Sequence, residues 1–425
     1  MTKVLLTGGS GFIAAHTLDL LLKHGHSVVT TVRTQEKADK IKRAYPKEVE
    51  GGQLGFAIVP DIAQPGAFDQ AVISDPPFEA VLHTASPFHF NVTDVQKDLL
   101  DPAIIGTTGI LKSIKQSAPT VKRVVITSSF AAIVDPAKGF WPGHVYSEED
   151  WNPITEEEAR ENPTAGYRAS KTFAEKAAWD FLEKEKPNFT IATINPPMVY
   201  GPIIHNLDSL ENLNTSNQRI LWATQGKFKD EIPPSGVHFW VDVRDVAAAH
   251  VAAFEKDEAA NKRFFTLSGY FSNKEIINII RKNFPQYKDL PSDSTPGGDY
   301  PAAPGSDGLY NFSPTAPQFV DFYFKTFDES RANLGPLYRD HSMLTFEAQP
   351  VLGAAAIVEK LQNLPFQQVV HRKDTVDCQP TSEDGSGILV LVTGALQVGR
   401  RTGQAHELHT VFPPQEGRQR KLVRL

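Results

Sequence analysis

The segment K-V-L-L-T-G-G-S-G-F-I-A-A-H, residues 3–16, decides the fold of the N-terminal part of the chain. Its apolar first half predicts a buried strand, and Gly8, Gly11 and Ala14 then follow at the spacing of a pyrophosphate-binding turn. Glycines let the backbone approach a phosphate, and the helix that follows presents free N–H groups to its charge. Because the turn lies between a strand and a helix, we predict a dinucleotide site; the alternative is a simple tight turn.

Short β-branched runs alternate with longer helical stretches over roughly the N-terminal two thirds of the chain. Crossover helices are expected near residues 16–24 and 165–184, and a capping box of Ser272 and Glu275 marks one more helix. This alternation predicts an α/β fold with a parallel, doubly wound sheet. The expected strands are residues 3–8, 27–32, 54–59, 80–85, 123–128 and 189–194.

The residues after the second expected strand indicate which dinucleotide binds. NAD-selective sites usually place Asp or Glu here to bind the ribose 2′-hydroxyl, whereas this chain has Arg33, followed by Lys37. Two cations suit a 2′-phosphate, so NADPH is favoured. The alternative is that both are solvated charges at a helix start. Asp61, after the third strand, either accepts a hydrogen bond from the adenine amino group or belongs to a surface turn.

Tyr167 and Lys171 are spaced so that both lie on one face of a helix. A carbonyl reductase needs an acid to protonate the developing alkoxide, and a phenol can serve where a cation stabilises its phenolate. Ser129 follows the fifth expected strand at the carboxyl edge of the sheet, where α/β folds bind ligands, and its hydroxyl can donate to the same oxygen. The three residues predict a carbonyl-reducing site. For Tyr167 and Lys171 the alternative is a surface pair.

Four motifs carry a family resemblance: T-G-x-x-G-F-I-A at 7–14, R-V-V-I-T-S-S at 123–129, Y-x-x-x-K at 167–171 and N-P-P-M-V-Y-G-P at 195–202. With them the chain strongly resembles the extended short-chain dehydrogenase/reductases. Within these it is most similar to the dihydroflavonol 4-reductase branch and to the fungal NADPH-dependent methylglyoxal and 3-methylbutanal (aldehyde) reductases. The likeness covers residues 1–290 almost without a break. It implies a Rossmann domain with a small substrate lobe, built largely from residues 196–290, and hydride transfer from NADPH to an aldehyde or ketone.

The resemblance also assigns roles to residues at matching positions. It implies Ser129, Tyr167 and Lys171 as the catalytic triad, with Lys171 also binding the nicotinamide ribose. The substrate would lie near Phe88, Asn214, Thr215 and Ser216. No metal is expected. The cofactor would contact Gly8, Gly11, Phe12, Ile13, Arg33, Lys37, Asp61, Ile62, Thr84, Ala85, Ser86, Tyr167, Lys171, Pro196 and Val199.

A stretch rich in Pro and Gly, residues 291–317, interrupts the α/β pattern and predicts a linker or the junction of two genes in one reading frame. The reductase likeness stops here, without the helix–strand–helix that usually completes the substrate lobe. Residues 318–398 then strongly resemble nuclear transport factor 2, and Glu347 matches the acidic residue that contacts a lysine of Ran. That family is a small α+β cone that dimerises and binds Ran-GDP and phenylalanine-rich nucleoporins. The segments that carry the likeness are 318–328, 337–347, 353–367 and 371–380.

The last residues, 399–425, break the charge pattern. The whole chain carries a net charge of −7, yet this tail has six Arg or Lys and only two Glu. The transport factor family would supply here an acidic stretch that contacts Ran and two further strands. We therefore predict that 318–398 is an incomplete domain followed by a frameshifted basic tail. The alternative is a true fusion whose second unit lacks sheet strands.

Three classes of function follow from these features. The favoured one is an NADPH-dependent reductase of aldehydes or ketones with an appended module. The second is a nuclear-transport adaptor that binds Ran-GDP and nucleoporins, weakened by the missing acidic stretch, with a poorly active reductase half. The third is a hydroxysteroid-type dehydrogenase or a sugar-nucleotide epimerase on the same scaffold. A homodimer is a further expectation.

Composition argues against several other classes. Cys378 is the single cysteine among 425 residues, so no disulfide can form within the chain. The acidic balance argues against nucleic acid as a partner. Since no run of about 18 apolar residues occurs, no membrane span is expected. We expect a cytoplasmic protein, with the nucleus or nuclear envelope reachable through the C-terminal module.

Overall fold

The computed structural model divides the chain into two compact units, Met1–Tyr300 and Pro301–Leu425. Each unit is considered by itself. The residues that the structure describes are 1–86, 92–138, 144, 146–205, 207, 209–300, 312–346, 349–364, 369–380, 388–398, 409–410 and 420–424.

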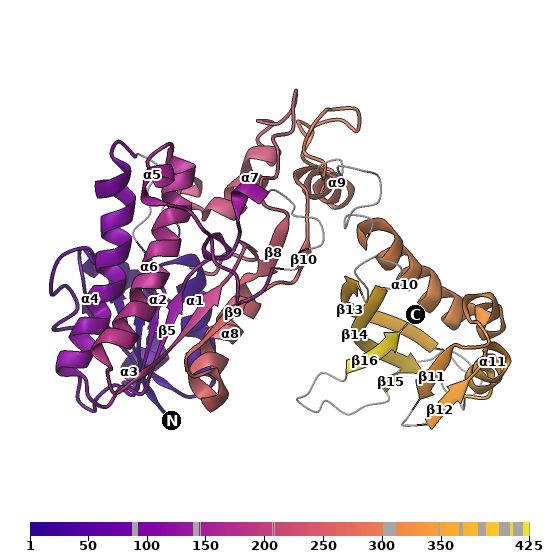
Figure 1. Cartoon of the computed structure of the whole chain (residues 1–425), viewed down its shortest axis with the longest axis horizontal. Helices are drawn as coiled ribbons and strands as arrows, with labels where there is room; N and C mark the ends of the chain where they lie inside the picture. The colour runs from indigo at the N-terminus through magenta and orange to yellow at the C-terminus, as the bar shows by residue number, and fades with distance from the viewer. Residues whose placement is uncertain are drawn as a thin grey trace. The chain divides into compact units, whose positions relative to one another are not determined.

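The first unit is built on a seven-stranded sheet in the order β3-β2-β1-β4-β5-β6-β9 (Figure 1). All neighbouring strands run parallel, which confirms the predicted doubly wound α/β fold. Strands that are buried on both faces are nearly continuous apolar runs, and six of the seven were expected from the sequence on this basis. The edge strand Lys262–Phe265 was not expected, because its first two residues are charged. The strands are β1 (Lys3–Thr7), β2 (Ser27–Val32), β3 (Leu54–Ile58), β4 (Ala80–His83), β5 (Arg123–Thr127), β6 (Thr190–Asn195) and β9 (Lys262–Phe265).

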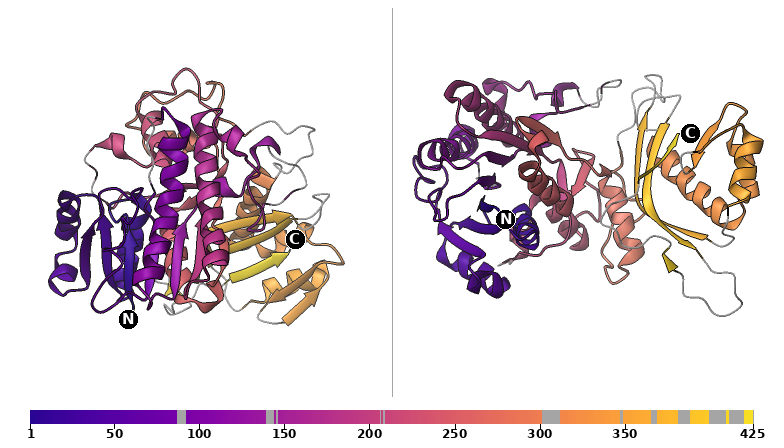
Figure 2. Two further views of the ribbon diagram at one scale, coloured as in Figure 1. Left: turned by 60° about the vertical axis from the view of Figure 1, so that its left-hand side comes forward. Right: turned by 90° about the horizontal axis from the view of Figure 1, so that it is seen from below.

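Helices cover both faces of this sheet (Figure 2). Alternate residues of a strand point to opposite faces, so Val4 and Leu6 of β1 belong to one core and Leu5 to the other. The first core includes α1 (Phe12–Lys23) and α8 (Val243–Glu255), and the second includes α4 (Asp101–Ser117) and α6 (Pro163–Glu185). The sheet is therefore held between two helical layers.

A smaller lobe continues from the carboxyl side of the sheet. Its three short strands are β7 (Met198–Tyr200), β8 (Phe239–Asp242) and β10 (Gly269–Tyr270), and its helices are α7 (Thr215–Thr224) and α9 (Asn273–Asn283). The Ser272 side chain caps α9 by accepting a hydrogen bond from the Glu275 backbone N–H, as the capping box predicts. The apolar core of the lobe consists of Ala223, Phe228, Ile232, Ile277 and Ile280.

The first unit extends further than the expected boundary at residue 290. Ile232 N–H donates to the Pro296 carbonyl and Lys274 N–H to the Gly298 carbonyl, each at 3.0 Å. The Tyr300 hydroxyl donates to the Glu275 carboxylate at 3.0 Å. Residues 291–300 therefore pack on the small lobe rather than forming a linker.

The second unit is an α+β arrangement, in agreement with the predicted fold. Its main sheet pairs β13 (Val369–Pro380) with β14 (Ile388–Val398) in antiparallel register. Its core includes Val320, Phe327 and Ile357. The remaining elements are α10 (Phe312–Glu329), β11 (Met343–Phe346), β12 (Gln349–Leu352), α11 (Ala354–Gln362), β15 (His409–Thr410) and β16 (Arg420–Arg424).

Two segments of this unit differ from the sequence expectations. Helix α10 begins at Phe312, inside the expected linker 291–317. Strands β15 and β16 both pair with β14, so the sheet does not end at residue 398 as expected. Backbone hydrogen bonds form a ladder whatever the side chains are, so this pairing does not depend on the tail having the family's sequence. The predicted frameshift is a statement about the gene and stays a prediction.

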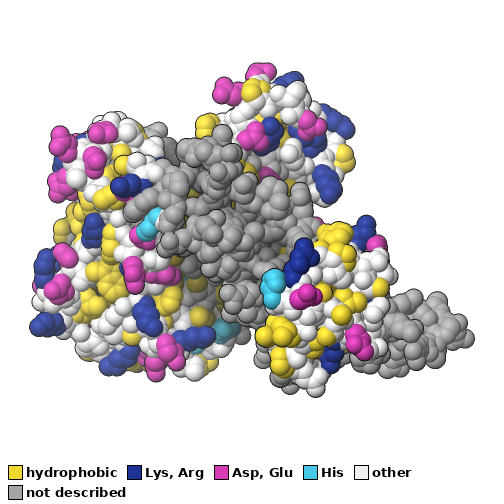
Figure 3. Space-filling model, turned by 45° about the vertical axis from the view of Figure 1, so that its right-hand side comes forward, with side chains coloured by type: hydrophobic (Ala, Val, Ile, Leu, Met, Phe, Trp, Pro, Cys, Tyr) yellow, Lys and Arg dark blue, Asp and Glu magenta, His cyan; other side chains and the backbone are white. Residues whose placement is uncertain are grey.

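Charged side chains of both signs are intermixed over the described surface on the face drawn in Figure 3. None of the described helices is both long and apolar enough to cross a lipid bilayer.

The packing of residues 291–300 can be tested with two glycines of nearly equal backbone conformation. Gly298 (φ +69°) and Gly236 (φ +73°) both lie in the left-handed region, but a Cβ on Gly298 would lie 2.1 Å from Cγ2 of Ile232, whereas none of the described atoms lies within 4 Å at Gly236. Gly236→Ala should lower the free energy of unfolding by about 1–2 kcal/mol through backbone strain alone. Gly298→Ala should cost about 1–3 kcal/mol more through overpacking, measured by denaturant unfolding. Equal losses would contradict the packing.

Candidate active site

The glycine-rich turn is shaped by close backbone contacts that exclude side chains. Gly8 has a φ of +74°, and a Cβ there would lie 3.0 Å from the Ala85 Cα. A Cβ on Gly9 would lie 2.0 Å from Thr30 Oγ1. Gly11 is the N-cap of α1 and supplies no side-chain cap, so the first N–H groups of the helix are available to a phosphate. This strand–turn–helix confirms the context that the glycine motif requires, and its narrow cradle fits a pyrophosphate.

The two cations expected near the 2′-phosphate lie where β2 leads into α2 (Gln35–Ala44). Arg33 is exposed, and Lys37 is half-buried in the first turn of the helix, which Thr34 caps. Lys37 lines a cavity of about 250 Å³ together with Gly9 and Ser10 of the turn. The sequence therefore places at least one cation beside the glycine-rich turn.

Phe12 and Ile13, two residues expected to contact the cofactor, lie in the first turn of α1. The Phe12 side chain is buried in the core and packs edge-on against His16, with the ring centroids 5.9 Å apart. Ile13 is partly buried against the same core. Only their backbone N–H groups, at the start of α1, are oriented as the phosphate site needs.

Asp61 and Ile62 follow β3 in a surface turn. The Asp61 carboxylate accepts hydrogen bonds from Gln64 Nε2 at 2.8 Å and from the Ala63 N–H at 2.9 Å, and these bonds, with the nearby charge of Arg33, lower its pKa. The structure thus supports the surface-turn alternative for Asp61, and an adenine contact stays a prediction. Ile62 lines a small cavity that also includes Ser86 and Lys171.

The three expected catalytic residues converge at the carboxyl edge of the sheet. Ser129 follows β5 and starts a short helical turn, Phe130–Ala132, by accepting from the Ala131 N–H at 3.1 Å. Tyr167, on α6, is hydrogen-bonded to Ser129. Lys171 Nζ, one helical turn further along, lies 5.8 Å from the centroid of the Tyr167 ring. The structure therefore brings the triad together.

The surroundings tune both titratable members of this group. Burial raises the pKa of Tyr167, and the hydrogen bond with Ser129 opposes that rise. Burial lowers the pKa of Lys171 to about 8. At neutral pH the phenol therefore keeps its proton, as an acid must, while the ammonium beside it is charged and stabilises a phenolate.

The segment after β4 links the glycine-rich turn to this acid. Thr84 Oγ1 donates to the Thr7 carbonyl at 2.5 Å, and the Ala85 N–H donates to Thr7 Oγ1 at 3.1 Å. Ser86 Oγ accepts from Lys171 Nζ at 2.7 Å. The expected cofactor-lining segment 84–86 therefore contacts the turn on one side and the catalytic lysine on the other.

The residues expected near the nicotinamide and the substrate hold one another in place. The Pro196 carbonyl accepts from the Phe130 N–H at 2.9 Å. Asn214 Nδ2 donates to the Val199 carbonyl and Ser216 Oγ accepts from the Val199 N–H, each at 3.1 Å. Asn214 and Ser216 thus anchor β7, and a substrate contact stays a prediction for them and for the exposed Thr215. Phe88 lies outside the described residues.

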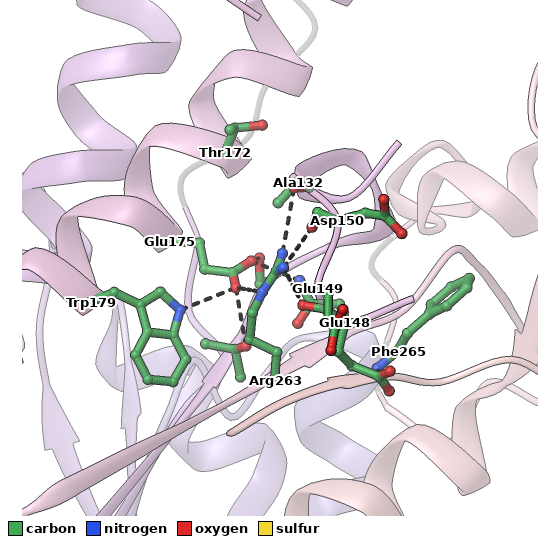
Figure 4. Close-up of polar contacts among 12 residues, drawn as sticks. Ala132, Glu148, Glu149, Asp150, Thr172, Glu175, Trp179, Arg263 and Phe265 are labelled. Carbon is green, nitrogen blue, oxygen red and sulfur yellow. Dashed lines mark hydrogen bonds and ion pairs between the residues drawn. The ribbon is translucent and has the colours of Figure 1, made fainter. Parts of the chain in front are cut away.

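Sequence reasoning missed a buried polar network around Glu175, the α6 residue one helical turn after Lys171 (Figure 4). Glu175 and Arg263 form its ion pair, with Arg263 Nε 2.6 Å from Glu175 Oε1. Glu175 lies one helical turn after Lys171 on α6, and this spacing was a signal that a carboxylate lies close to the triad. Arg263 lies beside Lys262 in β9, a strand that is not among those expected from the sequence.

We expect the affinity for NADPH to fall as pH rises through about 8, the pKa of Lys171, because this group is charged below that pKa and neutral above it. The hydrogen bond that changes is the one expected from Lys171 to the nicotinamide ribose. A charged hydrogen bond exceeds a neutral one by about 1 kcal/mol, so the Kd for NADPH should rise about fivefold between about pH 7 and about pH 9 in calorimetric titrations. In Lys171→Met, Kd should be higher and nearly independent of pH over this range. An equal pH dependence in both proteins would assign the titration to another group.

Comparison with known proteins agrees with this geometry. The model of the NAD dependent epimerase/dehydratase family matches residues 4–268, and that of the nuclear transport factor 2 (NTF2) domain matches residues 315–417. A ketoreductase of Aspergillus niger is 47% identical over 342 residues, covering 80% of this chain and 94% of its own. The NADPH-dependent methylglyoxal reductase of Saccharomyces cerevisiae is 39% identical over 314 residues, covering 73% of this chain and 88% of its own.

Solved structures show the same relationship. The NADPH complex of Gre2 from Candida albicans has a TM-score of 0.64 and 41% identity, covering 69% of this chain and 86% of its own. The NADPH complex of yeast methylglyoxal/isovaleraldehyde reductase has a TM-score of 0.65 and 39% identity, with the same coverage. Together with the glycine-rich turn and the converging triad, these matches show that the chain belongs to the NAD dependent epimerase/dehydratase family.

Proposed function

We propose that this protein reduces the carbonyl group of a small aldehyde or ketone with NADPH. The observation that carries the proposal is the convergence of Ser129, Tyr167 and Lys171 at the carboxyl edge of the sheet, beside the glycine-rich turn. Relatives at 39–47% identity include a ketoreductase and NADPH-dependent methylglyoxal reductases. When bound, NADPH supplies the hydride.

The chain's own residues bind the cofactor and move the proton. The uncapped start of α1 and the narrow turn at Gly8 and Gly9 bind the pyrophosphate, and Arg33 and Lys37 favour the 2′-phosphate form. Tyr167 donates its proton to the carbonyl oxygen as negative charge develops there, and Ser129 donates a hydrogen bond to the same oxygen. Lys171 stabilises the resulting phenolate.

The substrate that best suits the proposal is a small aldehyde such as methylglyoxal or isovaleraldehyde, which name two of the relatives. A sugar-nucleotide epimerase or a hydroxysteroid-type dehydrogenase is not favoured, because the relatives at this level of identity are aldehyde and ketone reductases. Net oxidation of NADPH separates a reductase from an epimerase, which regenerates its cofactor in each turnover.

Removing the acid tests the mechanism. Tyr167→Phe should lower kcat for NADPH oxidation with methylglyoxal by about 10²–10⁴-fold, the usual contribution of a general acid, and should leave the Kd for NADPH nearly unchanged. Tyr338→Phe removes a buried phenol from the second unit, where it contacts the Tyr323 hydroxyl at 2.7 Å, and should leave kcat as in the wild type. Wild-type turnover in Tyr167→Phe would overturn the assignment.

For the second unit, we propose an interaction module. The match to the NTF2 domain supports this proposal, and its candidate partners are Ran-GDP, phenylalanine-rich nucleoporins and a second copy of the chain. Glu347, the residue expected to contact Ran, lies outside the described residues. Because the acidic stretch of the family is replaced by basic sequence after residue 398, binding to Ran should be weak. We propose a cytoplasmic location, with the nuclear envelope reachable through this module.

A pull-down with Ran-GDP tests this second proposal independently of the reductase. We expect weak capture of Ran-GDP that Glu347→Lys abolishes through charge repulsion. The reductase variant Tyr167→Phe serves as the control and should capture Ran-GDP as the wild type does. Capture that is insensitive to Glu347→Lys would contradict the expected role of this residue.

A further inference from the structure

A buried ion pair beneath the triad takes no part in the mechanism described above. The side chains of Glu175 and Arg263 are 1% and 8% exposed, and Arg263 Nε lies 2.6 Å from Glu175 Oε1. Burying two charges is costly, and a well-packed apolar pair is often at least as stable. Glu175 belongs to α6, the helix that carries Tyr167 and Lys171, and Arg263 belongs to the edge strand β9. The pair therefore joins the catalytic helix α6 to the edge strand of the sheet next to β6.

The Glu175 carboxylate binds the end of β5 from below. Its Oε2 accepts from Ser128 Oγ at 2.5 Å and from Asn195 Nδ2 at 2.7 Å. Asn195 Nδ2 also lies 3.3 Å from the Ser129 carbonyl, and its residue is fully buried. The carboxylate thus holds Ser128 directly and the Ser129 backbone through Asn195. Figure 4 shows the same carboxylate pointing toward Arg263 and Trp179.

Oε1 of the Glu175 carboxylate also accepts several hydrogen bonds. Besides Arg263 it accepts from Thr193 Oγ1 at 3.2 Å and from Trp179 Nε1 at 3.3 Å. Arg263 Nε, Trp179 Nε1 and Asn195 Nδ2 can only donate, so an amide in place of the carboxylate would set its own N–H group against at least one of them.

Arg263 also binds residues 148–151, a segment that leads to the turn after the catalytic serine. Its Nη1 donates to the carbonyls of Glu148 and Asp150, each at 2.6 Å, and its guanidinium stacks on Trp151 with 3.7 Å between Cζ and the ring centroid. Asn152, which follows Trp151, is fully buried and donates to two carbonyls of the turn after Ser129. Its N–H donates to the Ala132 carbonyl at 3.0 Å, and its Nδ2 to the Ala131 carbonyl at 2.9 Å.

We propose that the Glu175–Arg263 pair positions Ser129 relative to Tyr167 and Lys171 for the reduction. The two hydroxyls reach one carbonyl oxygen from different elements, the turn after β5 and helix α6, so their relative placement determines the rate. Glu175 is the α6 residue that binds the end of β5, and Arg263 anchors the segment that covers the following turn. Both are positioning residues, and this role rests on the proposed reductase function.

The kinetic test is Glu175→Gln, which keeps the side-chain volume and removes the charge. With methylglyoxal as substrate, kcat should fall about 10–100-fold, the cost of a displacement of about 1 Å, while the Kd for NADPH stays within about twofold of the wild type. The primary isotope effect on kcat, measured with NADPH deuterated at C4, should rise because hydride transfer becomes slower. A kcat and an isotope effect equal to those of the wild type would overturn the proposal.

The matched control is Glu255→Gln, the same substitution in a carboxylate that is hydrogen-bonded to His24 and His26. Glu255 ends α8, in the part of the unit where α1 also ends, and belongs to neither the triad nor the network. Loss of its negative charge weakens the two hydrogen bonds that Oε1 accepts, so Tm should fall while kcat and the isotope effect stay unchanged. An equal loss of kcat in both variants would show that general destabilisation lowers the rate.

Two further variants separate positioning from stability. Glu175→Gln/Arg263→Met removes both charges, so it should recover much of the Tm lost in Glu175→Gln, whereas kcat should stay low. Recovery of kcat together with Tm would show that the pair is only structural. Ser128→Ala removes a single hydrogen bond to Glu175 and keeps the ion pair, so it should fold even if Glu175→Gln does not. It should lower kcat by a smaller factor than Glu175→Gln, and unchanged kcat would contradict the role of this contact.

Hydrogen exchange followed by mass spectrometry tests the positioning without any turnover. In the full-length protein, Glu175→Gln should speed exchange in peptides that contain residues 129–134 and 148–153 and leave peptides from residues 3–23 as in the wild type. Unchanged exchange at 129–134 would overturn the proposal even if kcat falls. If the wild type does not oxidise NADPH with aldehydes while exchange responds as expected, the proposed function fails and the positioning of Ser129 by Glu175 stands.

Discussion

The close backbone contacts of Gly8 and Gly9 are the constraint on which the rest of the site depends. Neither position has room for a side chain, because the backbone at Ala85 and the side chain of Thr30 occupy that space. The end of β1 is therefore held against the ends of both neighbouring strands, β2 and β4. Since Ser86 follows directly and binds Lys171, the turn that binds the cofactor and the helix that carries the acid belong to one connected structure.

Two buried cations near the catalytic serine, Arg263 and Lys171, have different kinds of partners. Arg263 is paired with a carboxylate and hydrogen-bonded to backbone carbonyls, so its guanidinium is held in one position. Lys171 donates to a neutral hydroxyl instead, and burial lowers its pKa to about 8. Lys171, which has no carboxylate partner among the described residues, can therefore stabilise the negative charge that develops on Tyr167 during the reaction. Arg263 instead holds the surrounding segments in position.

Six strands of the large sheet, the glycine-rich turn and the triad could be predicted because each depends on local pattern or on the shared edge where parallel strands end. Glu175 and Arg263 lie 88 residues apart, and their pairing follows from a strand order that no local pattern reveals. Residues 291–300 looked like a linker because Gly and Pro are abundant, yet backbone hydrogen bonds to Ile232 and Lys274 give them fixed positions. The ring of Phe12 is buried in the core, so the expected contact with the cofactor stays a prediction for its backbone N–H group.

The residues of the proposed reduction site all belong to the first unit. Every described residue of the triad, the glycine-rich turn and the network lies before Tyr300, and residues 291–300 close the small lobe through Ile232, Lys274 and Glu275. Side chains add to these backbone contacts: Lys274 pairs with Asp299, and the Thr295 hydroxyl donates to the Lys229 carbonyl. All of these contacts lie within the first unit.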